Sequence, residues 1–249
     1  MSTRRLVRAY LIEAKYECIR AMRTPAFGVP FFVLPAALYL LFGVLFFGPE
    51  LRKTPNAAEF LYLGFSTFGV MGPGMFGFGV SVALERESGL LTLKRALPMP
   101  PPAYLIGKMV MATSFAGVVT LSMVLAATLF SHPHLTAGQL LFIACILTVG
   151  SLPFCAMGLF IGTRTSGKSS PAFVNLLFLP MIYLSGIMIP MPQSLQWISR
   201  FSPAFYLEQL ALVSIGLPHY GTAVLDIAVL GGVTLVCTFF AVRRLVRVS

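Results

Sequence analysis

The sequence predicts an all-α, polytopic membrane protein with six transmembrane helices, folded as one domain over residues 1–249. The chain is 57% hydrophobic and only 10% charged, and its mean hydropathy is +0.86. A chain with so few charged residues cannot cover the surface of a water-soluble globule. Lipid must therefore be its main solvent. Several uncharged stretches also reach the roughly 20 apolar residues that a helix needs to cross a hydrocarbon core of about 30 Å.

The first element is an amphipathic helix over residues 4–23. Apolar residues recur there at spacings of three and four, and basic residues occupy much of the rest. We expect this helix to lie in the cytoplasmic membrane interface with its basic face on anionic head groups. A cytosolic helix packed against another protein is the alternative. The apolar positions are Leu6, Val7, Tyr10, Leu11, Ala14, Cys18, Ile19 and Met22.

Six apolar stretches follow, and each predicts one crossing. The long uncharged stretch after residue 108 is broken at His132, Pro133 and His134, which predicts a helical hairpin. The last stretch tolerates Asp226 in its first turn. Six glycines in the second stretch favour close helix packing over a mobile helix. The predicted spans are about 25–47, 60–83, 107–130, 139–162, 172–190 and 222–242.

Positive charge predicts the orientation of these spans. With the N-terminus in the cytoplasm, fifteen of the eighteen Lys and Arg residues fall on the cytoplasmic side, as the positive-inside rule requires. Both termini are then cytoplasmic, and we expect the bacterial cytoplasmic (inner) membrane as the location. The same bias explains the net charge of +10, so nucleic acid is not expected as a partner.

The segment 191–215, between the fifth and sixth spans, predicts a pair of external helices that are re-entrant or interfacial. Pro190, Pro192 and Pro203 punctuate two short apolar helical stretches there. Trp197 and Tyr206 suit the membrane interface, where aromatic rings gather.

The sequence holds no pattern expected of an enzyme or a metal site. The three histidines fall in predicted external loops without a carboxylate cluster nearby. A phosphate-binding loop is missing, because the cluster Ser166–Ser170 lacks the required upstream glycine. The predicted spans carry no ionisable residue at mid-membrane depth, which disfavours a gradient-driven carrier. We therefore expect no catalytic residue, metal or cofactor on this chain, and an energy source outside it.

Polar chemistry concentrates in the cytoplasmic loop 85–105. Glu85, Arg86 and Glu87 come just after the second span. A short amphipathic helix follows and ends before Pro98.

This loop resembles the signature of the type-2 ATP-binding-cassette (ABC) exporter permeases. The match departs at Leu91 and Lys94, where threonine and an acidic residue are usual, and at the prolines of 100–102. A second family pattern precedes the last span, and the helix at 4–23 resembles the family's interfacial elbow helix. The matching loop residues are Glu85, Arg86, Glu87, Gly89, Leu90, Leu97, Pro98, Gly107 and Lys108. Ser88 lies between the matching residues and is expected to belong to the same coupling loop. The second pattern is Leu184, Ser185, Gly186, Pro190, Trp197, Pro203 and Tyr206.

The resemblance implies a permease subunit of an ATP-driven exporter that works as a homodimer or heterodimer. Separate cytosolic ATPase subunits would bind ATP and Mg²⁺, and the loop 85–105 would couple them to the membrane helices. A non-transporting anchor or assembly protein, an ion-coupled carrier and an intramembrane enzyme are the alternatives.

Aromatic residues mark a candidate pathway for a lipid-like, apolar drug-like or glycan cargo, although core packing explains the same rings equally well. The candidates are Phe65, Phe68, Phe76, Phe78, Phe178 and Tyr183.

Overall fold

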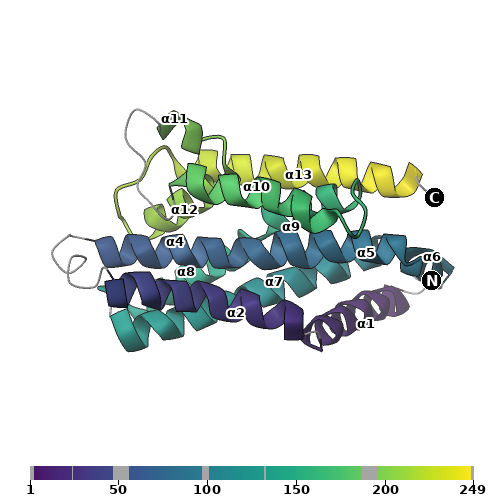
Figure 1. Cartoon of the computed structure of the whole chain (residues 1–249), viewed down its shortest axis with the longest axis horizontal. Coiled ribbons are helices and arrows are strands. Elements are labelled where there is room, and N and C mark those ends of the chain that lie inside the picture. The colour runs from purple at the N-terminus through teal and green to yellow at the C-terminus, as the bar shows by residue number, and fades with distance from the viewer. Residues whose placement is uncertain are drawn as a thin grey trace.

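The protein is described by a computed structural model that covers residues 3–23, 25–46, 56–96, 101–131, 133–186 and 196–247. Within these residues every regular element is a helix. Long helices run side by side along the longest axis of the molecule (Figure 1), and both ends of the chain lie at the same end of the bundle. We call this the N/C end and the opposite one the far end.

The N-terminal helix α1 (Thr3–Met22) confirms the helix expected at 4–23, and it packs along α7 at the N/C end. The next helix, α2 (Pro25–Tyr39), continues as the π-helix η1 (Leu40–Phe46). Pro30 and Pro35 lie inside α2. Prolines are tolerated in membrane helices because neighbouring groups re-satisfy the freed backbone.

The second predicted span is one continuous helix built from α4 (Ala57–Gly72), the π-helix η2 (Pro73–Val80) and α5 (Ser81–Glu87). Its glycines serve close packing on α9. A Cβ atom on Gly79 would lie 2.6 Å from the carbonyl oxygen of Gly158, and one on Gly162 would lie 2.2 Å from that of Gly79. Such contact leaves no room for a side chain between the two backbones.

The polar loop forms the short helix α6 (Leu90–Ala96), and α7 (Pro101–Ala126) follows with η3 (Ala127–Ser131). We expected the third span to start near residue 107, but α7 begins at Pro101. Proline suits a first turn because its missing N–H has no partner there. The hairpin then returns as α8 (Ala137–Val149) and α9 (Leu152–Gly162). Thr136 and Gln139 form a capping box that starts α8.

The last elements are α10 (Ser170–Ser185), α11 (Gln196–Ser199), α12 (Pro203–Ser214) and α13 (Ala223–Arg247). Both α11 and α12 lie toward the far end (Figure 1). The helix α12 packs among α4, α8, α10 and α13, and its Leu207 is fully buried. It is therefore inserted between longer helices.

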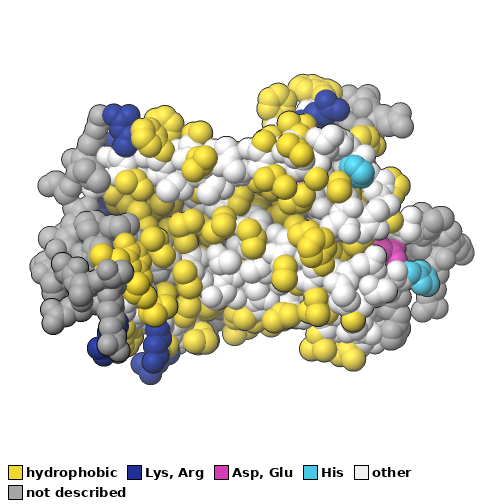
Figure 2. Space-filling model, turned by 180° about the vertical axis from the view of Figure 1, so that it is seen from behind, with side chains coloured by type: hydrophobic (Ala, Val, Ile, Leu, Met, Phe, Trp, Pro, Cys, Tyr) yellow, Lys and Arg dark blue, Asp and Glu magenta, His cyan; other side chains and the backbone are white. Residues whose placement is uncertain are grey.

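Four continuous helical stretches are long and apolar enough to cross a bilayer. They are Ala57–Glu87 (α4, η2 and α5), Ala103–Phe130 (α7 and η3), Ala137–Gly162 (α8 and α9) and Ala223–Leu245 (α13). Two shorter apolar helices, Val29–Gly43 and Ser170–Ser185, lie where the first and fifth spans are predicted. Figure 2 shows hydrophobic side chains across the middle of one face and Lys and Arg only near its two ends. The protein is an all-α, multi-pass membrane protein, and its six-crossing topology stays a prediction.

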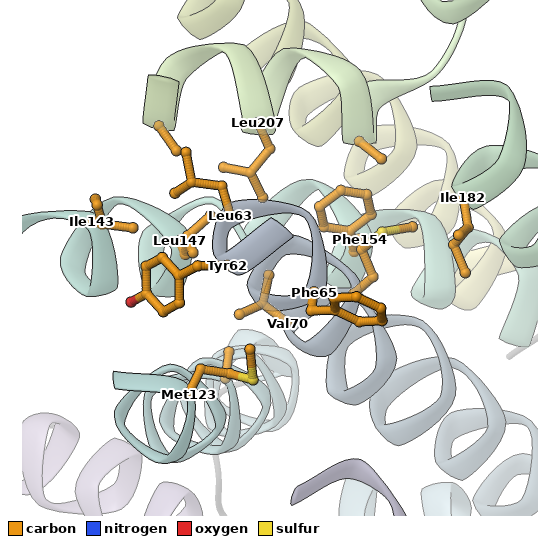
Figure 3. Packing of buried hydrophobic residues seen from close by; sticks show 14 of the residues in the cluster. Tyr62, Leu63, Phe65, Val70, Met123, Ile143, Leu147, Phe154, Ile182 and Leu207 are labelled. Atoms are coloured by element: carbon orange, nitrogen blue, oxygen red, sulfur yellow. The ribbon is translucent and has the colours of Figure 1, made fainter. Parts of the chain in front are cut away.

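The core is organised around α4. Its Tyr62, Leu63, Phe65 and Val70 point to different sides of the helix (Figure 3) and are buried. They belong to one apolar cluster with residues from the helices around them, namely Met123, Ile143, Leu147, Phe154, Ile182 and Leu207. The second predicted span is thus the central helix of the bundle.

Candidate functional site

The candidate site lies at the N/C end, where the second predicted span (α4, η2 and α5) ends in the motif Glu85–Gly89. Glu85 is in the last turn of α5 and is only 1% exposed. The chain then turns sharply at Gly89, whose φ of +75° is a conformation that favours glycine. The amide of Leu93 donates to the carbonyl of Gly89 and so starts α6. The motif therefore sets the angle between the central helix and α6.

The carboxylate of Glu85 binds groups from two other helices. Lys108 Nζ of α7 donates to Glu85 Oε1 at 2.7 Å, and the hydroxyl of Tyr104 donates to Oε2 at 2.7 Å. Arg20 of α1 also forms a salt bridge with Oε1. Both oxygens of this buried carboxylate are thus occupied by donors from α1 and α7.

Two more acidic residues, Glu13 and Glu17 of α1, extend these contacts to α6. Lys108 Nζ donates to Glu17 Oε2 at 2.8 Å. Lys94 of α6 binds Glu13 and Glu17 together. The result is one network that joins α1, α5, α6 and α7. We call it the ion-pair cluster, and it comprises Glu13, Glu17, Arg20, Glu85, Lys94, Tyr104 and Lys108.

Pairing favours the charged forms of Glu17 and Lys94 despite their burial. Burial alone would raise the pKa of Glu17, but the ammonium groups of Lys108 and Lys94 outweigh it and hold that pKa below 4.5. Burial would likewise lower the pKa of Lys94, but its hydrogen bonds to Glu13 and Glu17 raise it above the ordinary value. The folded state therefore favours the ionised form of both residues.

Arg86 and Glu87 hold the loop between α9 and α10. The guanidinium of Arg86 donates to the carbonyl oxygens of Thr163 and Thr165, the latter at 2.6 Å. The amide of Gly167 donates to Glu87 Oε2 at 2.7 Å. Ser88 is exposed, and its hydroxyl donates to the carbonyl of Glu85. Arg86 and Glu87 thus bind the α9–α10 loop, whereas Ser88 closes the turn of its own helix.

The loop motif described from the sequence contains Glu85–Gly89 and Lys108, but no residue of α1 was predicted to contact it. Glu13 and Glu17 are the only acids of a basic helix and stand four residues apart, so they share a face. That spacing is the signal that could have found them. Leu97 and Pro98, also predicted here, lie outside the described residues.

The second predicted motif lies toward the far end. Gly186 ends α10 with a φ of +79°, as a C-terminal glycine commonly does. Pro203 occupies the first turn of α12, and Tyr206 is half-buried against the core. Trp197 is exposed and contacts Phe201 edge to face, at 6.2 Å between ring centroids. Pro190 lies outside the described residues.

The candidate pathway aromatics divide into separate groups. Phe178 contacts Phe68 at 5.8 Å and Phe76 at 5.3 Å between ring centroids. Phe65 instead packs with Tyr39 and Phe42. The other two candidates lie apart from these contacts, since Phe78 is fully buried in a second apolar cluster and Tyr183 is exposed on α10.

A cavity of about 440 Å³ adjoins the ion-pair cluster, between α1, α2, η2 and α7. Glu17, Arg20, Glu85 and Lys108 line its polar side. Its apolar side is formed by residues that include Pro30, Phe31, Phe76, Val80 and Met111. The cavity thus connects the predicted aromatic region with the cluster.

The chemistry of this site is that of fixed ion pairs. Within the part of the chain that the structure describes, no three His, Cys, Asp or Glu side chains are grouped to hold a metal ion. The charged groups of the cluster instead bind one another across four helices. Such an arrangement is suited to holding helices together and passing a displacement from one to the next.

Comparison with known families identifies the family of the chain. The family model of the ABC-2 type transporter matches residues 8–215. No curated protein matches the chain at a significant level. The matched range includes α2 to α12 and most of α1, and with them every residue of the ion-pair cluster. The chain belongs to the ABC-2 type transporter family, the transmembrane permease components of ABC transporters.

Proposed function

We propose that the protein is the permease subunit of an ATP-driven exporter, with α6 as the helix that receives the motion of a partner ATPase. The observation that carries the proposal is the ion-pair cluster. It binds α6 through Lys94 to α1, and through Glu17 and Lys108 to α7. A displacement of α6 would therefore be transmitted to helices of the membrane domain.

The surface of α6 supports docking of another protein. Leu93 is 67% exposed, although it lies at the N/C end, outside the four long candidate spans. An exposed leucine gains free energy when a partner covers it. We propose that Leu93 docks into a cytosolic ABC ATPase, which binds ATP and Mg²⁺ on its own surface.

The remaining parts of the proposal follow from the same family. Two permease copies, identical or different, would enclose the pathway, and the N/C end would face the cytoplasm of a bacterial inner membrane. The cavity beside Phe76 mixes apolar and charged lining, which favours an amphipathic or lipid-like cargo. Phe68, Phe76 and Phe178 would then line the route from this cavity.

Co-purification with an ABC ATPase encoded beside this chain tests the proposal. We expect a stable complex in detergent whose ATPase rate differs from that of the ATPase alone. Leu93→Ser should weaken the complex about 10- to 100-fold, because burying one leucine is worth about 1.5–3 kcal/mol.

Val224→Ser is the matched control, since Val224 is also largely exposed, at 77%, but lies at the far end. A wild-type chain that neither binds the ATPase nor alters its rate contradicts the exporter. Equal binding by Leu93→Ser and wild type contradicts docking through α6.

A further inference from the structure

The helix α1 sorts its charges between two sides. It contains two acids, Glu13 and Glu17, and both turn toward α6 and α7. Glu17 is 4% exposed, and the side chain of Glu13 is 14% exposed. Lys94 and Lys108 neutralise both carboxylates. The outward side of α1 is therefore left without negative charge.

Among the described side chains, three exposed cations lie on the outward side, namely Arg8 and Lys15 of α1 and Arg23 in the turn that directly follows it. At about 100° per residue they fall within roughly 80° of the helix circumference. None of the three forms an ion pair with another described residue. Positive charge on this side is thus concentrated and open to an external anion.

Large apolar side chains lie on the same outward side. Leu11 is 66% exposed and Tyr16 and Met22 are each 64% exposed. Cations mixed with exposed apolar groups suit a membrane interface, where apolar groups enter the acyl boundary and cations meet phosphates. The position agrees, because Met22 and Arg23 directly precede the segment predicted to make the first crossing.

We propose that the outward side of α1 binds anionic phospholipid head groups and that the bound lipid holds α6 in its coupled position. The residues of this lipid surface are Arg8, Leu11, Lys15, Tyr16, Met22 and Arg23. The link to α6 is Lys94, which binds Glu13 and Glu17 on the opposite side of α1. This second part of the inference rests on the proposed function.

Lipid binding is tested on the permease alone, which makes the result independent of any ATPase. Short-chain phosphatidylglycerol is titrated into the detergent-solubilised chain, and the unfolding midpoint is recorded. One cation near an anionic surface is worth about fivefold in binding, so Arg8→Gln/Lys15→Gln/Arg23→Gln should weaken binding about 100-fold. Short-chain phosphatidylcholine should bind weakly to both, and added salt should reduce the wild-type affinity.

The triple variant Lys168→Gln/Arg243→Gln/Arg244→Gln is the matched control. It removes the same charge from exposed residues at the same end of the molecule, and it should bind phosphatidylglycerol like wild type. Equal loss in both triples would overturn the proposal, because surface charge in general would then explain the binding. Unchanged binding in the α1 triple would overturn it directly.

The coupling part is tested in vesicles that contain the permease and its ATPase. In vesicles with phosphatidylglycerol the α1 triple should show the low coupled ATPase rate that wild type shows in pure phosphatidylcholine. A lipid-independent wild-type rate would overturn the coupling part. An α1 triple that releases the ATPase but still binds phosphatidylglycerol would assign this side of α1 to a protein contact instead. If no ATPase complex forms at all, the proposed function fails while the titration still decides lipid binding.

Discussion

Buried carboxyl groups lie at both ends of the bundle, but within the described part of the chain only those at the N/C end are paired with buried cations. Glu17 and Glu85 each bind Lys108 there. Among the described residues, no cation pairs with Glu208 of α12 or Asp226 of α13 at the far end. Glu208 is 6% exposed, and neither carboxyl oxygen of Asp226 has a hydrogen-bond partner.

The difference separates two uses of a buried acid. A paired carboxylate binds neighbouring helices strongly, and removal of one partner leaves an uncompensated charge. An unpaired carboxyl is stable in a dry site mainly in its neutral form, so its packing depends on pH. We therefore expect the N/C end to transmit displacements between helices, and we expect the packing of the far end to depend on pH.

Lys108→Met should break the comparison most strongly. It leaves Glu17 and Glu85 buried without Lys108 between them, which should cost about 3–5 kcal/mol of unfolding free energy. Lys168→Met changes an exposed lysine at the same end and should cost little. Unfolding of the purified chain in detergent measures both variants, and similar losses in both would show that the cluster contributes little.

Glu208→Gln should remove a pH dependence that originates at the far end. Burial raises the pKa of Glu208 from 4.5 to about 8, so the folded state favours the protonated form. Wild-type stability should be fully present below pH 4.5 and fall on the order of a few kcal/mol as the pH rises to about 8. The Gln variant should lack this fall. Stability measured between pH 5 and 9 tests it, and the same fall in the Gln variant would contradict it.

Glu17→Gln should weaken the opposite, acid limb of the pH profile. The pKa of Glu17 lies below 4.5 in the folded state, so its contribution is present above pH 4.5 and is lost as the pH falls below that value. The Gln variant should lose about 1–3 kcal/mol at neutral pH, because hydrogen bonds to a charged group are lost. Its stability should also fall less steeply in acid. An acid limb identical to that of wild type would assign the acid sensitivity to other carboxylates.

Arg86→Lys should have the smallest effect. The ammonium group cannot reproduce the two hydrogen bonds to the carbonyls of Thr163 and Thr165. We expect a loss of about 1 kcal/mol in unfolding free energy. Arg244→Lys, at an exposed position of α13, is the control. A larger loss than that of Lys108→Met would place the main contact of the N/C end at the α9–α10 loop.

Much of the fold could be predicted because helices solvated by lipid require long apolar stretches, which are visible in the sequence. Long uncharged stretches mark helices without knowledge of their neighbours. The start of α7 at Pro101 was not predicted because a run of prolines is typical of a loop. Proline is nevertheless compatible with the first turn of a helix. The close contact of Gly79 with Gly158 was anticipated as close packing, but its partner helix could not be named.

The candidate site was predicted on one side only. Glu85 and Lys108 stand out because they are charged residues beside apolar stretches. Their binding to Glu17 depends on how α1 lies against α7, which is a tertiary contact without a local sequence pattern. The pathway aromatics show the same limit, since Phe65 and Phe76 look alike in sequence yet contact different rings.

Trp197 is the only tryptophan in the chain, and it lies exposed in α11 toward the far end. Its intrinsic fluorescence is therefore an optical reporter of that end alone, without any label. Changes at the ion-pair cluster would alter its emission only if they reach across the whole bundle. A stopped-flow trace after ATP addition to the complex would then time the arrival of the conformational change at the far end.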